Sequence, residues 1–144
     1  MNVARIVALL LAFTASSGLV GVATASTLNV HDEARMKLTT SSGEDLVEAG
    51  QAKGTVPGTV KARLTVGSNV IVSFTIYIRG GGSISGHGSA AIHTNGAYAT
   101  FAGTVNIVRG SGRYSHSHGS AQVYGAINRE TLNATVQVIG KIQR

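Results

Sequence analysis

The chain has 144 residues, one proline and no cysteine, and aromatic residues make up only 5% of it. Its formal net charge is +6, but charged residues account for only 12% of the chain, which excludes a disordered polar protein and any disulfide framework. The length predicts a single domain, and 19 glycines among abundant valine, threonine and serine favour short strands joined by tight turns.

The basic balance, with an isoelectric point near 10.2, raises the question of a nucleic-acid partner. The lysines and arginines are scattered, however, and few aromatic residues are present for base stacking. We therefore expect no nucleic-acid partner. The charge favours an anionic cell-surface polymer or a carboxylate ligand, and solubility alone is the alternative explanation.

The N-terminus has the three parts of a signal peptide. Arg5 supplies the positive charge, residues 6–13 form an apolar stretch too short to span a bilayer, and Ala23–Ala25 fits the small-x-small cleavage pattern. We predict a signal peptide over 1–25 and a mature chain that begins at Ser26. The mature chain is then secreted, extracellular or associated with the cell wall, and has no membrane span after cleavage. An uncleaved membrane anchor is the alternative.

Four later segments alternate apolar and polar residues with the period of two that is typical of strands, and they are rich in β-branched residues. They are residues 60–66, 70–78, 97–108 and 131–142. Residues 26–52 are harder to interpret. There the stretch LNVHDEARMKL predicts either a strand or a short helix, and SSGED predicts a loop.

Glycine-rich turns separate the later segments, with no helical pattern between them. Asn95-Gly96 is typical of a type I′ hairpin, in which both central residues need positive φ. Strands at such short spacing predict an antiparallel meander. One or two further strands from residues 26–52 would bring the total to seven or eight, enough to close into a barrel.

A weak repeat relates RGGGSISGHGSA at 79–90 to RGSGRYSHSHGSA at 109–121. The spacing between Arg79 and Arg109 equals the length of one hairpin, which is two strands and two turns. We therefore expect both arginine–glycine turns to lie at the same end of the sheet.

Several of these motifs, in this order, resemble one known family. The stretches GGGSISGHGSA, ATFAGTVNIVRGSGRYSHSHGSAQVYGAINR and VQVIGK are similar to the small secreted bacterial members of the allene oxide cyclase-like and dirigent-like barrel superfamily. In that superfamily a G-x-G-R-Y turn lies between two strands, and here it is Gly110, Gly112, Arg113 and Tyr114. The resemblance covers roughly residues 50–143.

The resemblance implies an all-β fold, an antiparallel β-barrel of about eight strands that is usually a homo-oligomer and has a cavity open at one end. The plant cyclases of this superfamily isomerise an unsaturated fatty-acid epoxide. The dirigent proteins steer the coupling of phenoxy radicals without being oxidants themselves. The matching motifs build turns and strands, so they transfer a fold and a cavity and no functional residues. The chain also lacks the cysteines of the plant dirigent pattern.

The stretch RYSHSHGS at 113–120 is the densest group of side chains that could take part in acid–base catalysis or metal binding. On a strand, Tyr114, His116, His118 and Tyr124 share one face, and they are the candidates for acid–base catalysis if that face lines the lumen. The opposite face is small and apolar and suits an interior better, which favours histidines outside the barrel or at its rim. A metal site would need a third ligand and no acidic residue is near in sequence, so we expect no metal and no cofactor.

Arg79, Arg109 and Arg113 are expected to form a basic rim that binds an anionic or carboxylate-bearing partner. The sequence thus predicts a secreted barrel that binds a small apolar or carboxylate-bearing ligand, or acts at the cell surface, without turnover. Two alternatives stay open. One is an enzyme, an isomerase or cyclase acting on an oxidised lipid, and the other is a structural or wall-binding barrel with no ligand cavity.

Overall fold

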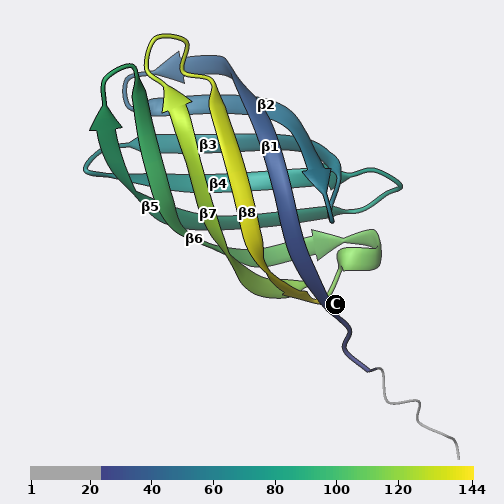
Figure 1. Ribbon diagram of the computed structural model, residues 1–144. Coiled ribbons are helices and arrows are strands. Elements are labelled where there is room, and N and C mark those ends of the chain that lie inside the picture. The colour runs from purple at the N-terminus through teal and green to yellow at the C-terminus, as the bar shows by residue number, and fades with distance from the viewer. Residues whose placement is uncertain (1–23) are drawn as a thin grey trace, which may run out of the picture.

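The computed structural model describes residues 24–144, which form one closed antiparallel barrel. Every strand pairs with the next one along the chain, and β8 closes the barrel by pairing with β1 (Figure 1). The strands are β1 (Thr27–Ser42), β2 (Asp45–Gly54), β3 (Gly58–Val66), β4 (Asn69–Ile78), β5 (Ser83–Asn95), β6 (Tyr98–Ser111), β7 (His118–Asn128) and β8 (Ala134–Gln143). The prediction of an all-β, eight-stranded antiparallel barrel is confirmed. The predicted signal peptide lies outside the described residues, apart from its last two.

Residues 26–52, for which the sequence predicts either a strand or a short helix, contribute the long strand β1 and most of β2. Burial alternates along β1 with a period of two, as in any strand that has one face in the interior. The segment SSGED is a tight turn, because β1 ends at Ser42 and β2 begins at Asp45. These two strands bring the total to the eight that close the barrel.

The apolar faces predicted for the four later segments all point into the barrel. Phe101 on β6 is only 8% exposed, whereas Ile71 on the outer face of β4 is 59% exposed. A side chain in place of Gly125 on β7 would overlap the Phe101 ring, so this glycine gives the ring its space. The interior is therefore assembled mainly from aliphatic side chains, with a few large aromatic rings between them.

We call one end of the barrel the sealed end. It comprises the β2–β3 connection, the β4–β5 turn, the short 3-10 helix η1 (Gly112–Tyr114) and the two chain ends of the barrel. Val56 and Ile84 are each 1% exposed there, and Tyr114 is 5% exposed. They belong to one apolar cluster that also receives side chains from β1, β6 and β8. Apolar packing therefore closes this end.

The opposite end, which we call the hairpin end, is formed by the β1–β2, β3–β4, β5–β6 and β7–β8 connections (Figure 1). A depression of about 370 Å³ lies at this end. Its lining includes the half-buried side chains of Val66, Ile92 and Leu132. The hairpin end is therefore packed less tightly than the sealed end.

The β5–β6 hairpin lies where the sequence predicts it, but its turn differs by one residue. Asn95 pairs with Tyr98 as the last pair of the ladder, and Gly96 alone has positive φ, at 60°. The central residues are thus Gly96 and Ala97, with positive φ at the first of them, as in a type II′ turn. The type I′ prediction was wrong, because Asn95 stays in the extended conformation of the strand.

Candidate functional site

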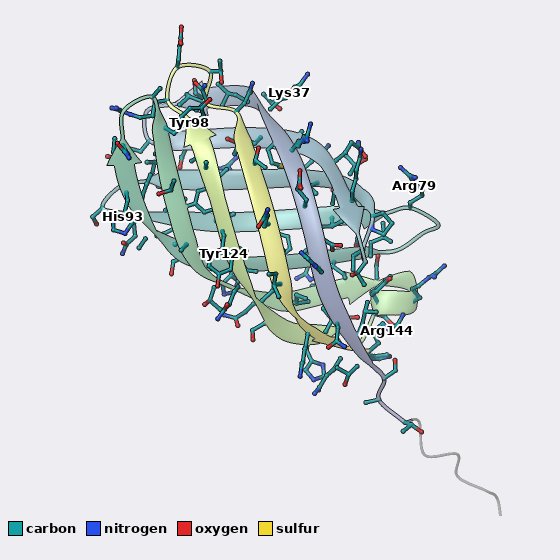
Figure 2. All side chains as sticks on the ribbon, in the orientation of Figure 1. Lys37, Arg79, His93, Tyr98, Tyr124 and Arg144 are labelled. Carbon is teal, nitrogen blue, oxygen red and sulfur yellow. The ribbon has the colours of Figure 1, made fainter. Side chains whose placement is uncertain are left out.

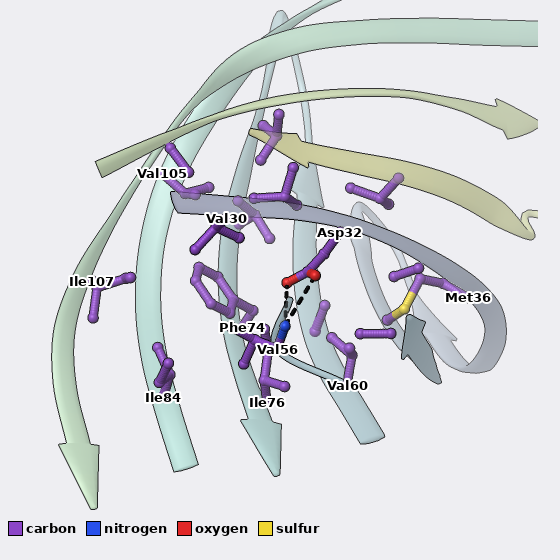
Figure 3. A pocket seen from close by; sticks show the side chains of 18 of the residues that line it. Val30, Asp32, Met36, Val56, Val60, Phe74, Ile76, Ile84, Val105 and Ile107 are labelled. Carbon is purple, nitrogen blue, oxygen red and sulfur yellow. Dashed lines mark hydrogen bonds between the residues drawn. The ribbon is translucent and has the colours of Figure 1, made fainter. Parts of the chain in front are cut away.

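The barrel encloses a cavity of about 120 Å³ with an almost entirely apolar wall (Figure 3). All eight strands contribute side chains to this wall. Phe74, Ile76 and Val138 point inward but are only half-buried, because they border the cavity. The chain therefore forms a lumen, not a core filled completely by its own side chains.

Two acidic side chains interrupt the apolar wall of the lumen. They are Asp32 on β1 and Glu48 on β2, and no other titratable side chain of the described chain lines the cavity. Asp32 is opposite Gly54 in the β1–β2 ladder, and Glu48 lies six residues before Gly54 on β2. At about 3.3 Å per residue their backbone positions are roughly 20 Å apart along the strands, so the two acids are not direct neighbours.

Glu48 is the buried acid without a protein partner. Its side chain is 1% exposed, and its Oε1 atom has no hydrogen bond. In the sheet it is flanked by Leu38 of β1 and Ala62 of β3, and neither can donate a hydrogen bond through its side chain. Burial raises the pKa of the Glu48 carboxyl to about 7. At neutral pH it therefore exists in both protonation states and can donate or accept a hydrogen bond or a proton.

Asp32, in contrast, has a fixed partner at the sealed end. The backbone N–H of Val56 donates to both carboxylate oxygens, at 3.0 and 3.2 Å (Figure 3). Burial raises the pKa of Asp32, while hydrogen bonds from the backbone of Val56 and Thr55 lower it in part. Val56 is thereby held at the bottom of the lumen. Asp32 has a structural role that explains its presence in the interior.

The structure separates the four side chains considered for acid–base catalysis. Tyr114 lies on η1 and is buried at the sealed end, and His116 lies in the turn that follows. Only His118 and Tyr124 lie on β7, and both are exposed on the outer surface. The prediction of one shared strand face was wrong, because η1 and a turn replace the first part of the expected strand. None of the four lines the cavity.

The three arginines of the predicted basic rim are all exposed near the sealed end. Arg79 follows β4, Arg109 lies near the end of β6, and Arg113 lies on η1. Figure 2 shows Arg79 and Arg144 at this end, and Lys37 and Tyr98 at the hairpin end. None of the three arginines lines the cavity, because the apolar cluster of the sealed end lies between them and the lumen.

Residues 24–144 contain no group of three or more histidine, aspartate and glutamate side chains placed to hold a metal ion. In the same range, no helix is long and apolar enough to cross a membrane.

Sequence reasoning missed both acids of the lumen, although the sequence contains a signal for each. Asp32 has the strand parity of Val30 and Ala34, and Glu48 has the parity of Leu46. An acidic residue on the apolar face of a strand is unusual, because burial of a carboxyl group needs a compensating partner. The signal was lost because residues 26–52 were not assigned to strands.

No protein-family model and no curated protein matches the sequence. The structure is similar to two solved structures of pterocarpan synthase dirigent proteins. GePTS1 matches with a TM-score of 0.61 and 15% sequence identity, over 90% of this chain and 94% of that chain. PsPTS1 matches with a TM-score of 0.56 and 16% identity, over 81% of this chain and 94% of that chain. At such identities the likeness shows the fold, and the resemblance to dirigent-like barrels is confirmed at that level.

Proposed function

We propose that the barrel binds a small, largely apolar ligand in its lumen, with the one polar group of the ligand against Glu48. The observation that carries this proposal is the buried Oε1 atom of Glu48 without a partner in an otherwise apolar wall. A buried polar atom without a hydrogen bond is unfavourable by about 1–3 kcal/mol. A ligand that pairs with Glu48 removes this penalty and buries its apolar part against the aliphatic wall.

The size of the cavity limits the ligand. Drug-sized molecules occupy pockets of roughly 300–1,000 Å³, whereas an apolar cavity of about 150 Å³ holds benzene. The lumen of about 120 Å³ therefore suits a ligand of about one ring or a short chain. The sealed end is closed by Val56 and Ile84, so the ligand enters through the hairpin end. A carboxylate-bearing ligand enters as the neutral acid, because no lysine or arginine of the described chain lines the lumen.

Catalysis is the second candidate function, and the same residue favours it. An acid with a pKa near 7 is well matched to proton transfer at neutral pH, as an isomerase or cyclase requires. Only one segment of a long oxidised lipid would fit the cavity, so the rest of such a substrate would extend through the hairpin end. A protein that only binds a small ligand does not need a substrate that extends out of the barrel, and we therefore favour binding without turnover.

Titration of the protein with benzene and cyclohexanone, followed by NMR, tests the binding site. Ala62 is half-buried in the wall beside Glu48, so Ala62→Leu should fill part of the lumen and weaken binding of both probes at least tenfold. Ala91 is exposed on the outside of β5, and Ala91→Leu is the matched control that should leave binding unchanged. Unchanged binding to the Ala62→Leu protein would place the ligand elsewhere.

The basic sealed end supports a separate role in attachment to an anionic polymer at the cell surface. Among the described residues the one ion pair is Arg35 with Glu33, so Arg79, Arg109 and Arg113 are not neutralised by a carboxylate. Guanidinium groups bind carboxylates through paired, charge-assisted hydrogen bonds. Attachment at the sealed end would leave the hairpin end free for ligands, which suits a secreted protein.

Binding to immobilised polygalacturonate tests this attachment. Retention should weaken with salt, because exposed charges are screened. Arg113→Ala should reduce retention more than His118→Ala, or than Arg63→Ala on the barrel wall. Retention that weakens neither with added salt nor in Arg113→Ala would contradict the basic rim.

Export is tested by N-terminal sequencing of the secreted protein, which should begin at Ser26.

A further inference from the structure

We propose that ligand binding in the lumen is coupled to the proton of Glu48, so that a neutral ligand with a hydrogen-bond acceptor binds the protonated barrel and is released on deprotonation. The ligand class would be small ketones, ethers or esters. This inference rests on the proposed function and adds the regulation of the same site.

The surroundings of Glu48 contain no group that could balance its negative charge. The inward neighbours on β1 are Met36 and Leu38, and those on β3 are Ala62 and Leu64. Strands β3 to β8 contribute only apolar side chains to the cavity wall. Asp32, the other acid of the lumen, is six residues further along the ladder and is engaged with Val56.

The charges of the adjacent strands lie on the outer face of the sheet. Lys37 on β1 and both Lys61 and Arg63 on β3 are exposed there, so the sheet itself separates them from the lumen. The charged form of Glu48 can therefore be stabilised only by water that enters the cavity. A cavity of about 120 Å³ has room for several water molecules.

The two protonation states thus favour different contents of the lumen. The protonated carboxyl donates its O–H to a carbonyl or ether oxygen, and the rest of the ligand contacts the aliphatic wall. The ionised carboxylate has no proton to donate and draws in water, which competes with the ligand for the same space. Because burial places the pKa of Glu48 at about 7, the change falls between mildly acidic and mildly alkaline pH.

A ligand that binds only the protonated state should lose affinity about tenfold for each pH unit above the pKa. Other ligand classes predict different slopes. A protonated amine would pair with the carboxylate and bind more tightly as the pH rises. A hydrocarbon, which accepts no hydrogen bond from Glu48, should depend much less on pH.

The test is the dissociation constant of cyclohexanone and of benzene for the purified protein at pH 5.5, 6.5, 7.5 and 8.5. We expect the affinity for cyclohexanone to be nearly constant below pH 6.5 and to weaken roughly eightfold between pH 7.5 and 8.5, with a much smaller change for benzene. Glu48→Gln keeps a hydrogen-bond donor and cannot ionise, so it should bind cyclohexanone equally at all four values.

Glu33→Gln, which removes an exposed carboxylate from the outer face of β1, is the matched control and should keep the slope of the unmodified protein. If benzene binds but the affinity for cyclohexanone is flat or rises with pH, the proton coupling is wrong and the lumen site stands. If the slope persists in Glu48→Gln, another group carries it and the coupling to Glu48 is wrong. If neither probe binds at any pH, the proposed ligand site itself is wrong.

Discussion

Asp32 and Glu48 both occupy inward-facing positions of the first two strands, but their surroundings differ. Both oxygens of Asp32 accept the backbone N–H of Val56, whereas Oε1 of Glu48 has no partner. The first carboxyl group completes the packing of one end of the barrel. The second is incomplete within the protein, and an incomplete buried acid in a cavity is a reason to look for a ligand.

The two ends of the barrel also differ in how completely their side chains are packed. The sealed end contains the most deeply buried aliphatic side chains, Val56 and Ile84, and the exposed arginines lie around it. The hairpin end carries a depression lined by half-buried side chains such as Ile92 and Leu132. Apolar packing is therefore tighter at the sealed end than around the depression at the hairpin end.

Two isoleucines on one strand give the largest expected effect. Ile84 and Ile92 both face inward on β5, the first 1% exposed at the sealed end and the second half-buried at the hairpin end. Ile84→Ala should lower the free energy of unfolding by about 2–5 kcal/mol, because it leaves a cavity in a packed cluster. Ile92→Ala should lower it by about 1 kcal/mol, because less apolar surface is buried there. Equal losses in chemical denaturation would contradict the difference between the two ends.

The pH dependence of stability distinguishes the two carboxyl groups. Glu48 titrates near 4.5 in the unfolded chain and at about 7 in the barrel, so between these values the folded state keeps a proton that the unfolded state has released. The free energy of unfolding should therefore fall as the pH rises from 4.5 to 7, by up to about 3 kcal/mol, and then level off.

Urea denaturation of the wild-type protein and of Glu48→Gln, at the same series of pH values, measures this fall. The variant should lack it, and the difference between the two proteins removes the contribution of Asp32, which is common to both. A fall of the same size in the variant would assign the effect to another group.

The strands could be predicted from the sequence wherever alternation was strict and β-branched residues were frequent. Residues 70–78 are the clearest case, with Val70, Phe74 and Ile78 on the inward face as the pattern indicates. The stretch 113–117 could not be predicted in this way. Gly112 has a φ of 60° and opens η1, so the chain leaves the strand geometry before Tyr114, and parity no longer determines where a side chain points.

The site was harder to predict than the fold, for a physical reason. The histidines and arginines are candidates for catalysis and ligand binding because their side chains are chemically versatile. Exposed polar and charged side chains are, however, common on the surface of any protein. What marks Glu48 is its lack of a partner, and that depends on the neighbours that β1 and β3 bring to it. Such neighbours are known only once the register of the sheet is known.

The hydrogen bond between Asp32 and Val56 gives the smallest of the expected effects, and it tests the structural role of this acid. Asp32→Ala leaves the Val56 N–H buried without an acceptor, which should lower the free energy of unfolding by about 1–3 kcal/mol. Asp32→Asn keeps an acceptor oxygen in the same position and should retain most of the stability at pH 8. Glu48→Ala breaks no hydrogen bond at Oε1 and should be neutral or stabilising at pH 8, because it removes a buried carboxylate that is ionised at that pH. Urea denaturation of the three variants at pH 8 compares the two carboxyl groups directly. If Glu48→Ala were as destabilising as Asp32→Ala, Glu48 would have a structural role as well, and its assignment to a ligand would lose its basis.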